Sequence, residues 1–307
     1  AVVAVEADDV NSPELQAALA DFRTQALATG EMEDPIQVQV NDDATVALVS
    51  VPLAGTGTDD ASTEALLTLR EDVIPATIGA VDGVDVAVTG EAASSYDFSQ
   101  LTKDRAPYVF AFVLLLAFGL LLVAFRSIVI AAKAVILNLL SVAAAYGLLV
   151  IIFQWGWGES LLGFESTGAI TAWLPLFLFV ILFGLSMDYH VFILSRVREA
   201  YDGGATTEEA VAHAIKTTAG TVTSAALVMV CVFSVFAALS FILFKMIGVG
   251  LAAAILIDAT IVRAVLLPAT MKLLGDWNWY LPKWLEWLPR LEGEKTPEAP
   301  GVPAPGA

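Results

Sequence analysis

Residues 107–125 read PYVFAFVLLLAFGLLLVAF, a run of 19 residues that contains no charged side chain. A helix needs about 20 apolar residues, at a rise of about 1.5 Å each, to cross the roughly 30 Å hydrocarbon core of a bilayer. Four more stretches of this kind lie at residues 134–153, 166–187, 217–244 and 246–274, and only the last contains charges. These lengths predict a membrane α-helical bundle over residues 106–275, with five transmembrane helices at about 107–125, 130–153, 170–194, 218–240 and 246–274.

The amino-acid composition also indicates a protein that lies in a lipid bilayer. Of the 307 residues, 57% are hydrophobic and 16% are charged, and the mean hydropathy is +0.75, outside the range of ordinary soluble domains. The charge is concentrated at one end. Residues 1–105 hold 20 Asp and Glu against 4 Lys and Arg, whereas the remainder holds 13 against 11. A domain this acidic repels nucleic acid, so we expect no nucleic-acid partner.

Residues 1–105 have the pattern of a small α/β domain. Alternating or apolar runs predict strands at 2–5, 37–40, 46–49 and 84–88, and capping signals predict helices over about 12–29 and from Ser62 onward. The order β-α-β-β-α-β is that of the ferredoxin-like motif. Residues 91–105 are polar and are expected to form a helical connector to the membrane.

The distribution of basic residues predicts the orientation, because cytoplasmic loops are enriched in Lys and Arg. With residues 1–105 outside, the single basic residue of the outer loops is Lys245. The inner segments then hold Arg126, Lys133, Arg196, Arg198, Lys216, Lys272, Lys283, Arg290 and Lys295. We therefore expect a multi-pass protein of the cytoplasmic (inner) membrane, with residues 1–105 extracytoplasmic and the C-terminus cytoplasmic. A domain that is exported ahead of the first helix also predicts at least one further helix upstream of Ala1.

The C-terminal residues fall into two parts. Residues 276–295 mix tryptophans with Lys283 and Arg290, which is typical of an amphipathic segment at a membrane interface. Residues 296–307 are rich in proline and are expected to be disordered.

An ionisable residue inside hydrocarbon is costly, so each one is a candidate functional residue. Asp188 follows 22 uncharged residues and lies about 25 Å below the outer face, counting from Thr171 at about 1.5 Å per residue. It is a candidate to load and release a proton, with the hydroxyl of Tyr189 as relay or partner. Gly184, one turn above, would let another helix approach closely. The alternative is an acid near a helix end that simply reaches water.

Asp258 and Arg263 are the other two intramembrane charges. A spacing of five places them about 140° apart on an α-helix, so we expect each to find its partner elsewhere rather than in the other. They form either a structural ion pair with another helix or part of the proton path, and Arg263 is a candidate cation to tune Asp188. Histidine is the residue type whose ordinary pKa lies nearest neutral pH, and His190 is either part of that path or a satisfied polar residue near a helix end.

Signatures of soluble enzymes are missing from the sequence. It contains no phosphate-binding loop and no His-Glu-x-x-His, and two histidines with one cysteine, Cys231, cannot build a usual zinc site. We expect no enzyme activity, no cofactor and no metal. Energy would then come from an ion gradient or from another subunit.

Several motifs together resemble one known family. They are GLSMDYHVFILSRVRE at residues 184–199, GGATTEEAV at 203–211, TTAGTVTSA at 217–225, and DATIVR at 258–263 followed by Pro268. These stretches resemble the MmpL (mycobacterial membrane protein large) transporters of the resistance-nodulation-division superfamily, over roughly residues 35–290. The Asp-Tyr stretch is the most specific part.

The resemblance implies an architecture and a mechanism. Such transporters have two similar halves, each with one helix, an extracytoplasmic porter domain and five more helices, and this chain is similar to the C-terminal half without its leading helix. Family members export lipids or lipid-like compounds with the proton gradient, and an Asp-Tyr pair from each half forms the relay. Asp188 and Tyr189 match that motif, and Asp258 matches an acidic position in the last helix. The missing N-terminal half would supply the second pair.

Three functions remain open on the sequence. The leading hypothesis is export of lipids or other amphiphiles, driven by the proton-motive force, with this chain as half of the transporter. The alternative is a non-transport membrane component with a lipid-sensing or assembly role. An intramembrane enzyme would require Asp188 and Asp258 to face each other across a water-filled cleft.

Overall fold

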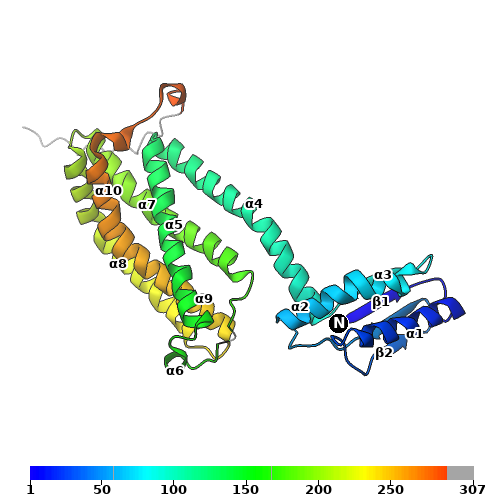
Figure 1. The fold of residues 1–307 in the computed structure, drawn as a ribbon. Helices are drawn as coiled ribbons and strands as arrows, with labels where there is room; N and C mark the ends of the chain where they lie inside the picture. The colour runs from blue at the N-terminus through cyan, green and yellow to red at the C-terminus, as the bar shows by residue number, and fades with distance from the viewer. Residues whose placement is uncertain (58, 167, 289–307) are drawn as a thin grey trace, which may run out of the picture. The chain divides into compact units, whose positions relative to one another are not determined.

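The computed structural model describes residues 1–57, 59–166 and 168–288, and the chain divides into two compact units, Ala1–Asp104 and Arg105–Ala307 (Figure 1). The proline-rich residues 296–307, together with Arg290 and Lys295, lie outside the described residues.

Unit 1 is built on a small antiparallel sheet. Its elements follow the order β1 (Val2–Glu6), α1 (Pro13–Ala28), β2 (Gln37–Val40), β3 (Val46–Ser50), α2 (Asp60–Thr68) and β4 (Asp85–Thr89), with a π-helical turn (Leu69–Val73), α3 (Ile74–Ala76) and a 3-10 turn (Ile78–Ala80) before β4. The strands lie in the order β2-β3-β1-β4, and every neighbouring pair is antiparallel. Each strand lies close to its expected position.

The register of the sheet explains how the unit forms a core. Val3 of β1 is opposite Val49 of β3, and both side chains are fully buried. Because side chains alternate along a strand, Val5 faces the same way and packs with Phe22 of α1 and Leu69. The helices therefore cover one face of the sheet with apolar side chains.

The second helix of unit 1 begins earlier than the sequence predicts. α2 starts at Asp60 because Asp59 is its N-cap, and a carboxylate oxygen of Asp59 accepts from the backbone N–H of Ser62 at 3.0 Å. The Ser62 hydroxyl also donates to Asp59 at 2.6 Å. These bonds, led by the one from the Ser62 side chain, lower the pKa of Asp59 to about 2. Ser62, expected near the first residue of the helix, is thus the residue that completes the cap.

In the described part of the chain, five helices are long and apolar enough to cross a membrane. They are α4 (Glu91–Phe125), α5 (Ile128–Leu149) with the π-helical turn Val150–Gln154, α7 (Leu174–Asp202), α8 (Thr207–Ala237), and α9 (Ile242–Ile257) continued by the π-helical segment η4 (Asp258–Leu266) and α10 (Leu267–Leu274). A short α6 (Glu159–Leu162) lies in the loop after α5. The polar connector 91–105 is helical, as expected, and is continuous with the first span.

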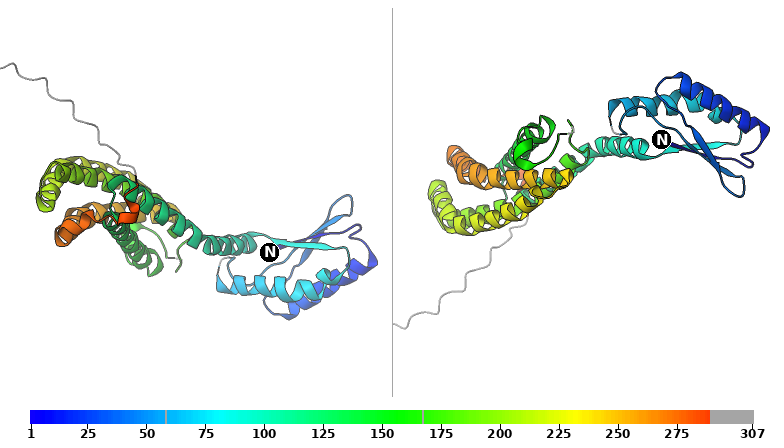
Figure 2. Two further views of the ribbon diagram at one scale, coloured as in Figure 1. Left: turned by 90° about the horizontal axis from the view of Figure 1, so that it is seen from above. Right: turned by 90° about the horizontal axis from the view of Figure 1, so that it is seen from below.

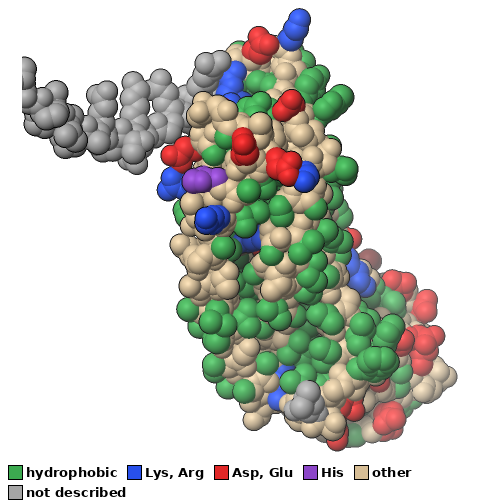
Figure 3. Space-filling model, turned by 90° about the vertical axis from the view of Figure 1, so that its left-hand side faces the viewer, with side chains coloured by type: hydrophobic (Ala, Val, Ile, Leu, Met, Phe, Trp, Pro, Cys, Tyr) green, Lys and Arg blue, Asp and Glu red, His purple; other side chains and the backbone are tan. Residues whose placement is uncertain are grey.

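α7 and α8 extend beyond the predicted spans at the loop that joins them. Thr206 and Glu209 form a capping box, with the Thr206 hydroxyl accepting from the Glu209 N–H and the Glu209 carboxylate accepting from the Thr206 N–H. α8 continues from this cap into the candidate span without a break. In Figure 3, charged side chains gather at one end of the bundle, and the surface beyond them is mainly apolar.

α8 and α9 pack side by side along the bundle, as both views in Figure 2 show. Gly248 allows this close approach. A Cβ atom added there would lie 2.6 Å from the Phe233 carbonyl oxygen and would also clash with the backbone nitrogen of Ala237. Both obstacles are backbone atoms of α8 and its end, so the helices themselves would have to move apart.

Gly248→Ala is therefore expected to destabilise the bundle by about 1–3 kcal/mol, the usual cost of overpacking, or more. Gly220→Ala is the matched control, because a Cβ on that helical glycine meets nothing within 4 Å. Thermal unfolding of the purified variants in detergent measures the difference. Equal stability of the two variants would contradict the close approach of α8 and α9.

The segment after α10 packs against the end of the bundle where α4 joins α5. It forms two 3-10 turns, Gly275–Trp279 and Lys283–Leu285. The side chain of Arg126, at the turn between α4 and α5, donates to the Glu286 carbonyl oxygen at 2.9 Å, and Trp279 stacks on Tyr201 of α7 with centroids 4.3 Å apart. Trp277, Trp284 and Trp287 are exposed. The predicted interfacial segment is thus anchored to several helices.

Candidate functional site

The candidate site is built on α7, whose two faces differ. Positions two residues apart on an α-helix are about 200° apart, so Ser186 and His190 lie on the side opposite Asp188. The buried face consists of Leu174, Leu178, Leu182, Ser186, His190, Ile193 and Val197. The exposed face consists of Phe177, Val180, Gly184, Asp188, Val191 and Ser195. The Asp-Tyr motif therefore straddles the boundary between a packed face and a free one.

Asp188 is exposed in the middle of the otherwise apolar face. Within residues 1–57, 59–166 and 168–288 it makes no hydrogen bond or ion pair. Gly184, one turn away, has nothing within 4 Å of its added Cβ, so no helix of the described chain uses the close approach that this glycine permits. The carboxylate of Asp188 is thus left unpaired by the described part of the chain.

Tyr189 turns toward the interior instead. Its ring lies under the guanidinium of Arg263, with 4.5 Å from Cζ to the ring centroid, and its hydroxyl is 3.5 Å from the Met229 sulfur of α8. A cation over an aromatic face is attracted by the ring quadrupole. Tyr189 therefore connects the boundary of the free face to the buried charges.

Asp258 and Arg263 form a buried ion pair with each other, contrary to the expectation from their spacing. The reason is the local backbone. Residues 258–266 are π-helical, and hydrogen bonds from i to i+5 bring a residue and its fifth neighbour toward the same side. The 140° separation applies only to a regular α-helix.

Two serines complete this network. The Ser186 hydroxyl donates to Asp258 Oδ2 at 2.8 Å, and the Ser141 hydroxyl of α5 donates to Asp258 Oδ1 at 3.2 Å. Arg263 donates to the Ser186 carbonyl oxygen at 2.9 Å. The two opposite charges are adjacent and their oxygens are hydrogen-bonded, which is the condition under which a buried pair is tolerated.

This geometry separates the predicted residues into two groups. Arg263 has Asp258 and Ser186 as its partners, and it does not pair with Asp188. Asp258 is directed toward α5 and the buried side of α7, whereas Asp188 lies on the free side. The facing pair of carboxylates that an intramembrane enzyme would need is not formed between them.

His190 is fully buried beside this network. Its Nδ1 lies 3.2 Å from the Ser186 carbonyl oxygen, and it interacts electrostatically with Asp258, Arg263 and Lys133. His213, in contrast, is exposed. The two histidines of the chain thus occupy opposite environments.

Lys133 lies in the second turn of α5. It is buried, and its ammonium donates to Asn278 Oδ1 at 2.8 Å. Asn278 in turn donates to the Met271 and Gly275 carbonyl oxygens, at 2.7 and 2.6 Å. Lys133 was predicted as one of the basic residues of the inner segments, and its burial against Asn278 does not follow from the sequence.

Lys245 also differs from expectation. It lies in the first turn of α9, buried rather than in an outer loop, and its ammonium donates to the Leu162 carbonyl oxygen. The helix begins at Ile242, so the charge falls inside its first turn. A backbone carbonyl, which no sequence pattern marks, is what satisfies it.

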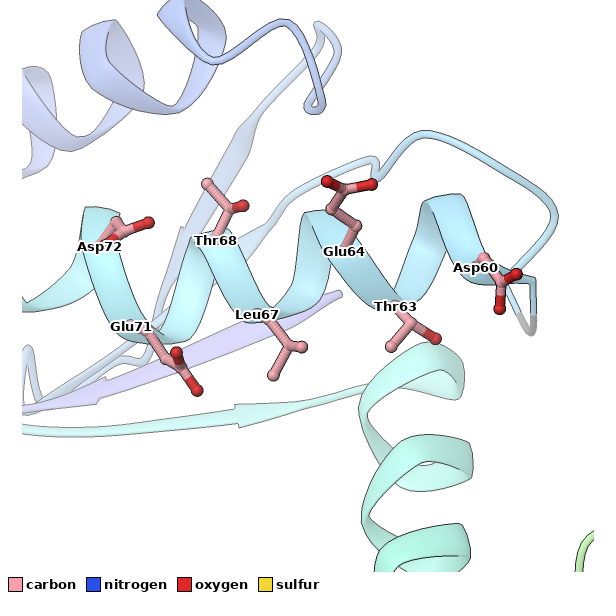
Figure 4. Close-up of a pocket in the computed structure, with 7 residues that line it drawn as sticks. All are labelled: Asp60, Thr63, Glu64, Leu67, Thr68, Glu71 and Asp72. Carbon is pink, nitrogen blue, oxygen red and sulfur yellow. The ribbon is translucent and has the colours of Figure 1, made fainter.

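Unit 1 has a groove of about 450 Å³ along α2 (Figure 4). It is lined by Asp60, Thr63, Glu64, Leu67, Thr68, Glu71 and Asp72. The four acids are exposed. Among the residues that the structure describes, no group of three or more His, Cys, Asp or Glu is arranged to hold a metal ion. Nothing in the groove identifies a ligand.

Some partners in the network carried a sequence signal that was not used. Ser186 lies four residues before His190 and eight after Leu178, on one helical face, so its burial follows from the helical period. Ser141 and Asn138 are polar residues of α5 that carry no distinguishing sequence pattern. The structure places Ser141 on Asp258, and the Asn138 side chain donates to the Phe183 carbonyl oxygen at 3.4 Å.

The sequence of the chain is similar to those of several known proteins. The chain is 42% identical over 273 residues to the "Mycolic acid-containing lipids exporter MmpL11" of Mycolicibacterium smegmatis, covering 89% of this chain and 28% of that protein. It is 39% identical over 284 residues to the "Heme uptake protein MmpL11" of Mycobacterium tuberculosis, covering 92% and 29%. It is 31% identical over 282 residues to the "Trehalose monomycolate exporter MmpL3" of Mycolicibacterium smegmatis, covering 89% and 27%.

The chain therefore spans less than a third of the length of these relatives. A family model described as "MMPL family" matches residues 6–291. That match covers unit 1 from Glu6 onward and all five candidate spans, with the Asp188, Asp258 and Arg263 positions. The chain belongs to the MMPL family.

Proposed function

We propose that this chain is one half of a transporter that exports lipids or other amphiphiles across the cytoplasmic membrane, driven by the proton-motive force. The names of two relatives, an exporter of mycolic acid-containing lipids and an exporter of trehalose monomycolate, support the substrate class. A third relative is named for heme uptake, and heme is itself an amphiphile. The common feature of the three names is a large, partly apolar cargo.

The observation that carries the proposal is the free carboxylate of Asp188. It stands on an apolar helix face in the inner half of the predicted span 170–194, with no partner in the described chain. A lone charge facing hydrocarbon is expensive, so this face would contact protein or a water-filled path in the working transporter. Protonation removes the charge. Moving a charge through the membrane potential supplies about 2.3 kcal/mol per 100 mV, so a proton bound and released here can drive a change of conformation.

The second half of the transporter would cover that face. The relatives are more than three times as long as the aligned part, which leaves room for a second bundle. In our proposal the other half contributes its own Asp-Tyr pair opposite Asp188 and Tyr189, and Gly184 lets the two central helices approach closely. The Asp258–Arg263 pair sits behind Tyr189 and would set the position of its ring.

Unit 1 would be the extracytoplasmic porter domain of this half. The element order β-α-β-β-α-β and the sheet order β2-β3-β1-β4 support a ferredoxin-like fold for it. The excess of basic residues in the opposite loops supports its placement outside the cell, with the C-terminus in the cytoplasm. Movement of the bundle on protonation would be transmitted through the continuous helix α4.

Reconstitution of the complete transporter tests the proposal. In proteoliposomes containing a fluorescent long-chain lipid, an imposed proton gradient is expected to drive lipid movement in the absence of ATP. A protonophore should reduce the movement to the level of protein-free vesicles. Lipid movement that continues unchanged after the gradient collapses would contradict proton coupling.

The same assay distinguishes the non-transport alternative. A lipid-sensing or assembly component would bind the fluorescent lipid without moving it between leaflets or compartments. Binding with no gradient-dependent movement, in a preparation whose insertion is verified by protease protection, would favour that alternative.

A further inference from the structure

Three buried polar atoms in the bundle have no hydrogen-bond partner in the described structure. They are Asn138 Oδ1 on α5, His190 Nε2 on α7 and Arg263 Nε on η4. The three residues are between 0% and 4% exposed. Buried polar atoms in proteins are nearly always bonded, and an unpaired one commonly marks an internal water. Three such atoms on elements that pack against one another indicate that the interior of the bundle contains water.

The three residues belong to one polar network. The Asn138 amide donates to the Phe183 carbonyl oxygen, and Ser186 is the next residue along that face of α7. The Ser186 carbonyl oxygen in turn interacts with both His190 Nδ1 and Arg263. Asn138 is therefore bonded to Phe183, and His190 and Arg263 both contact Ser186, one turn further along α7.

The tautomer of His190 follows from its contact with Ser186. A carbonyl oxygen can only accept, so Nδ1 carries the hydrogen and donates to it. In the neutral ring Nε2 then has a free lone pair and no donor to fill it. Asn138 Oδ1 is also an acceptor, and Arg263 Nε–H is a donor. Two acceptors and one donor match the bonding capacity of water.

Charged side chains on two other elements interact electrostatically with His190. Asp258 and Arg263 contribute from η4, and Lys133 contributes from α5. Lys133 lines a groove of about 420 Å³ between α5 and α10, together with Ile128, Val129, Ala132, Ile136, Leu137, Thr270 and Leu274. Asp258, Arg263 and Lys133 therefore all act electrostatically on His190.

We propose that internal water binds between α5, α7 and η4 through Asn138, His190 and Arg263, and that His190 exchanges a proton with this water. The second part rests on the proposed function, which supplies the excess protons. An N–H bond forms at Nε2 as an O–H bond of a hydronium ion breaks, leaving neutral water, and the reverse step releases the proton. His190 would then be a proton-transfer residue inside this half, separate from Asp188 on its outer face.

The composition of the chain provides a direct test. It contains two histidines, so ¹⁵N-histidine labelling of the 307-residue chain in lipid nanodiscs gives signals from His190 and His213 alone. The variant His213→Asn identifies the signal of His190. We expect a cross-peak between water protons and the His190 ring, and a ¹⁵N shift of Nε2 typical of an accepted hydrogen bond. Asn138→Leu should weaken that cross-peak.

If the unmodified chain shows no cross-peak between water and the His190 ring, the proposed water site is wrong. This measurement needs no transport activity, so it is independent of the proposed function. If Asn138→Leu does not fold, the unmodified chain still decides the matter.

The proton role is tested in the complete transporter with His190→Gln. Glutamine keeps hydrogen-bonding groups but does not titrate in this range. We expect export to fall at least tenfold and to lose its dependence on internal pH. Wild-type export with an unchanged pH profile would overturn the proton role of His190. Normal export by Asp188→Asn would instead count against the proposed function, whatever the spectrum of His190.

Discussion

Replacing Asp188 by asparagine is expected to reduce export by the complete transporter to background, while the protein still folds and inserts. Asparagine has nearly the same shape as aspartate but cannot take up or release a proton. In the described chain, Asp188 makes no hydrogen bond or ion pair that the substitution would break. Removing an unpaired charge from an apolar face should, if anything, favour insertion. The loss of activity would therefore report the proton chemistry rather than a damaged fold.

The measurement is gradient-driven lipid export in proteoliposomes, normalised to the amount of inserted protein. Asp202→Asn is the matched control, since it makes the same change on the same helix, at an exposed position where the carboxylate pairs with Arg198. An exposed ion pair contributes little to stability, so this control should export normally. Full export by a well-inserted Asp188→Asn protein would remove Asp188 from the mechanism.

Arg263→Met is expected to cause the largest loss of stability. It leaves Asp258 buried with two serine hydroxyls but no opposite charge. Breaking a buried pair by removing one partner typically costs about 3–5 kcal/mol, because the remaining charge is uncompensated. The stacking of the guanidinium on Tyr189 is lost as well. Unfolding in detergent, followed by circular dichroism, should show a clear fall in midpoint.

The double variant Asp258→Leu with Arg263→Met separates charge from packing. Replacing both members of a buried pair by apolar residues is often close to neutral, so much of the stability should return. Arg196→Met, which breaks only the exposed pair with Glu199, should change stability by about 1 kcal/mol or less. A double variant no more stable than Arg263→Met alone would show that the pair is not the source of the effect. A stable double variant that still fails to export would assign the pair a role in transport.

The location of the helices could be read from the sequence because hydrophobic length is a local property. Residues 107–125 lie within α4, and the stretch 246–274 lies within α9, η4 and α10. The strands of unit 1 were equally local, since alternation along β1 and β3 places Val3 and Val49 in the core. The errors occurred at boundaries set by single side chains, such as the cap formed by Asp59 on α2.

Which residues pair with each other in the site was harder to predict from the sequence. A spacing of five residues predicts separation on an α-helix, and the π-helical backbone of η4 reverses that prediction for Asp258 and Arg263. Backbone type over a few residues depends on the helices packed around it. The hydroxyls that hold Asp258 come from α5 and α7, more than 70 residues away in the chain.

By itself, the sequence determined that this is a membrane protein, how many apolar spans it has, and which residues in those spans are ionisable. Those properties depend on hydrophobic content and on single residues in their local context. Only the tertiary structure decided which of those residues meet. It put Asp188 on a free face of α7 and buried Asp258, Arg263 and His190 behind the opposite face. Burial and partnership are properties of helix packing, and packing depends on contacts between residues that are distant in the chain.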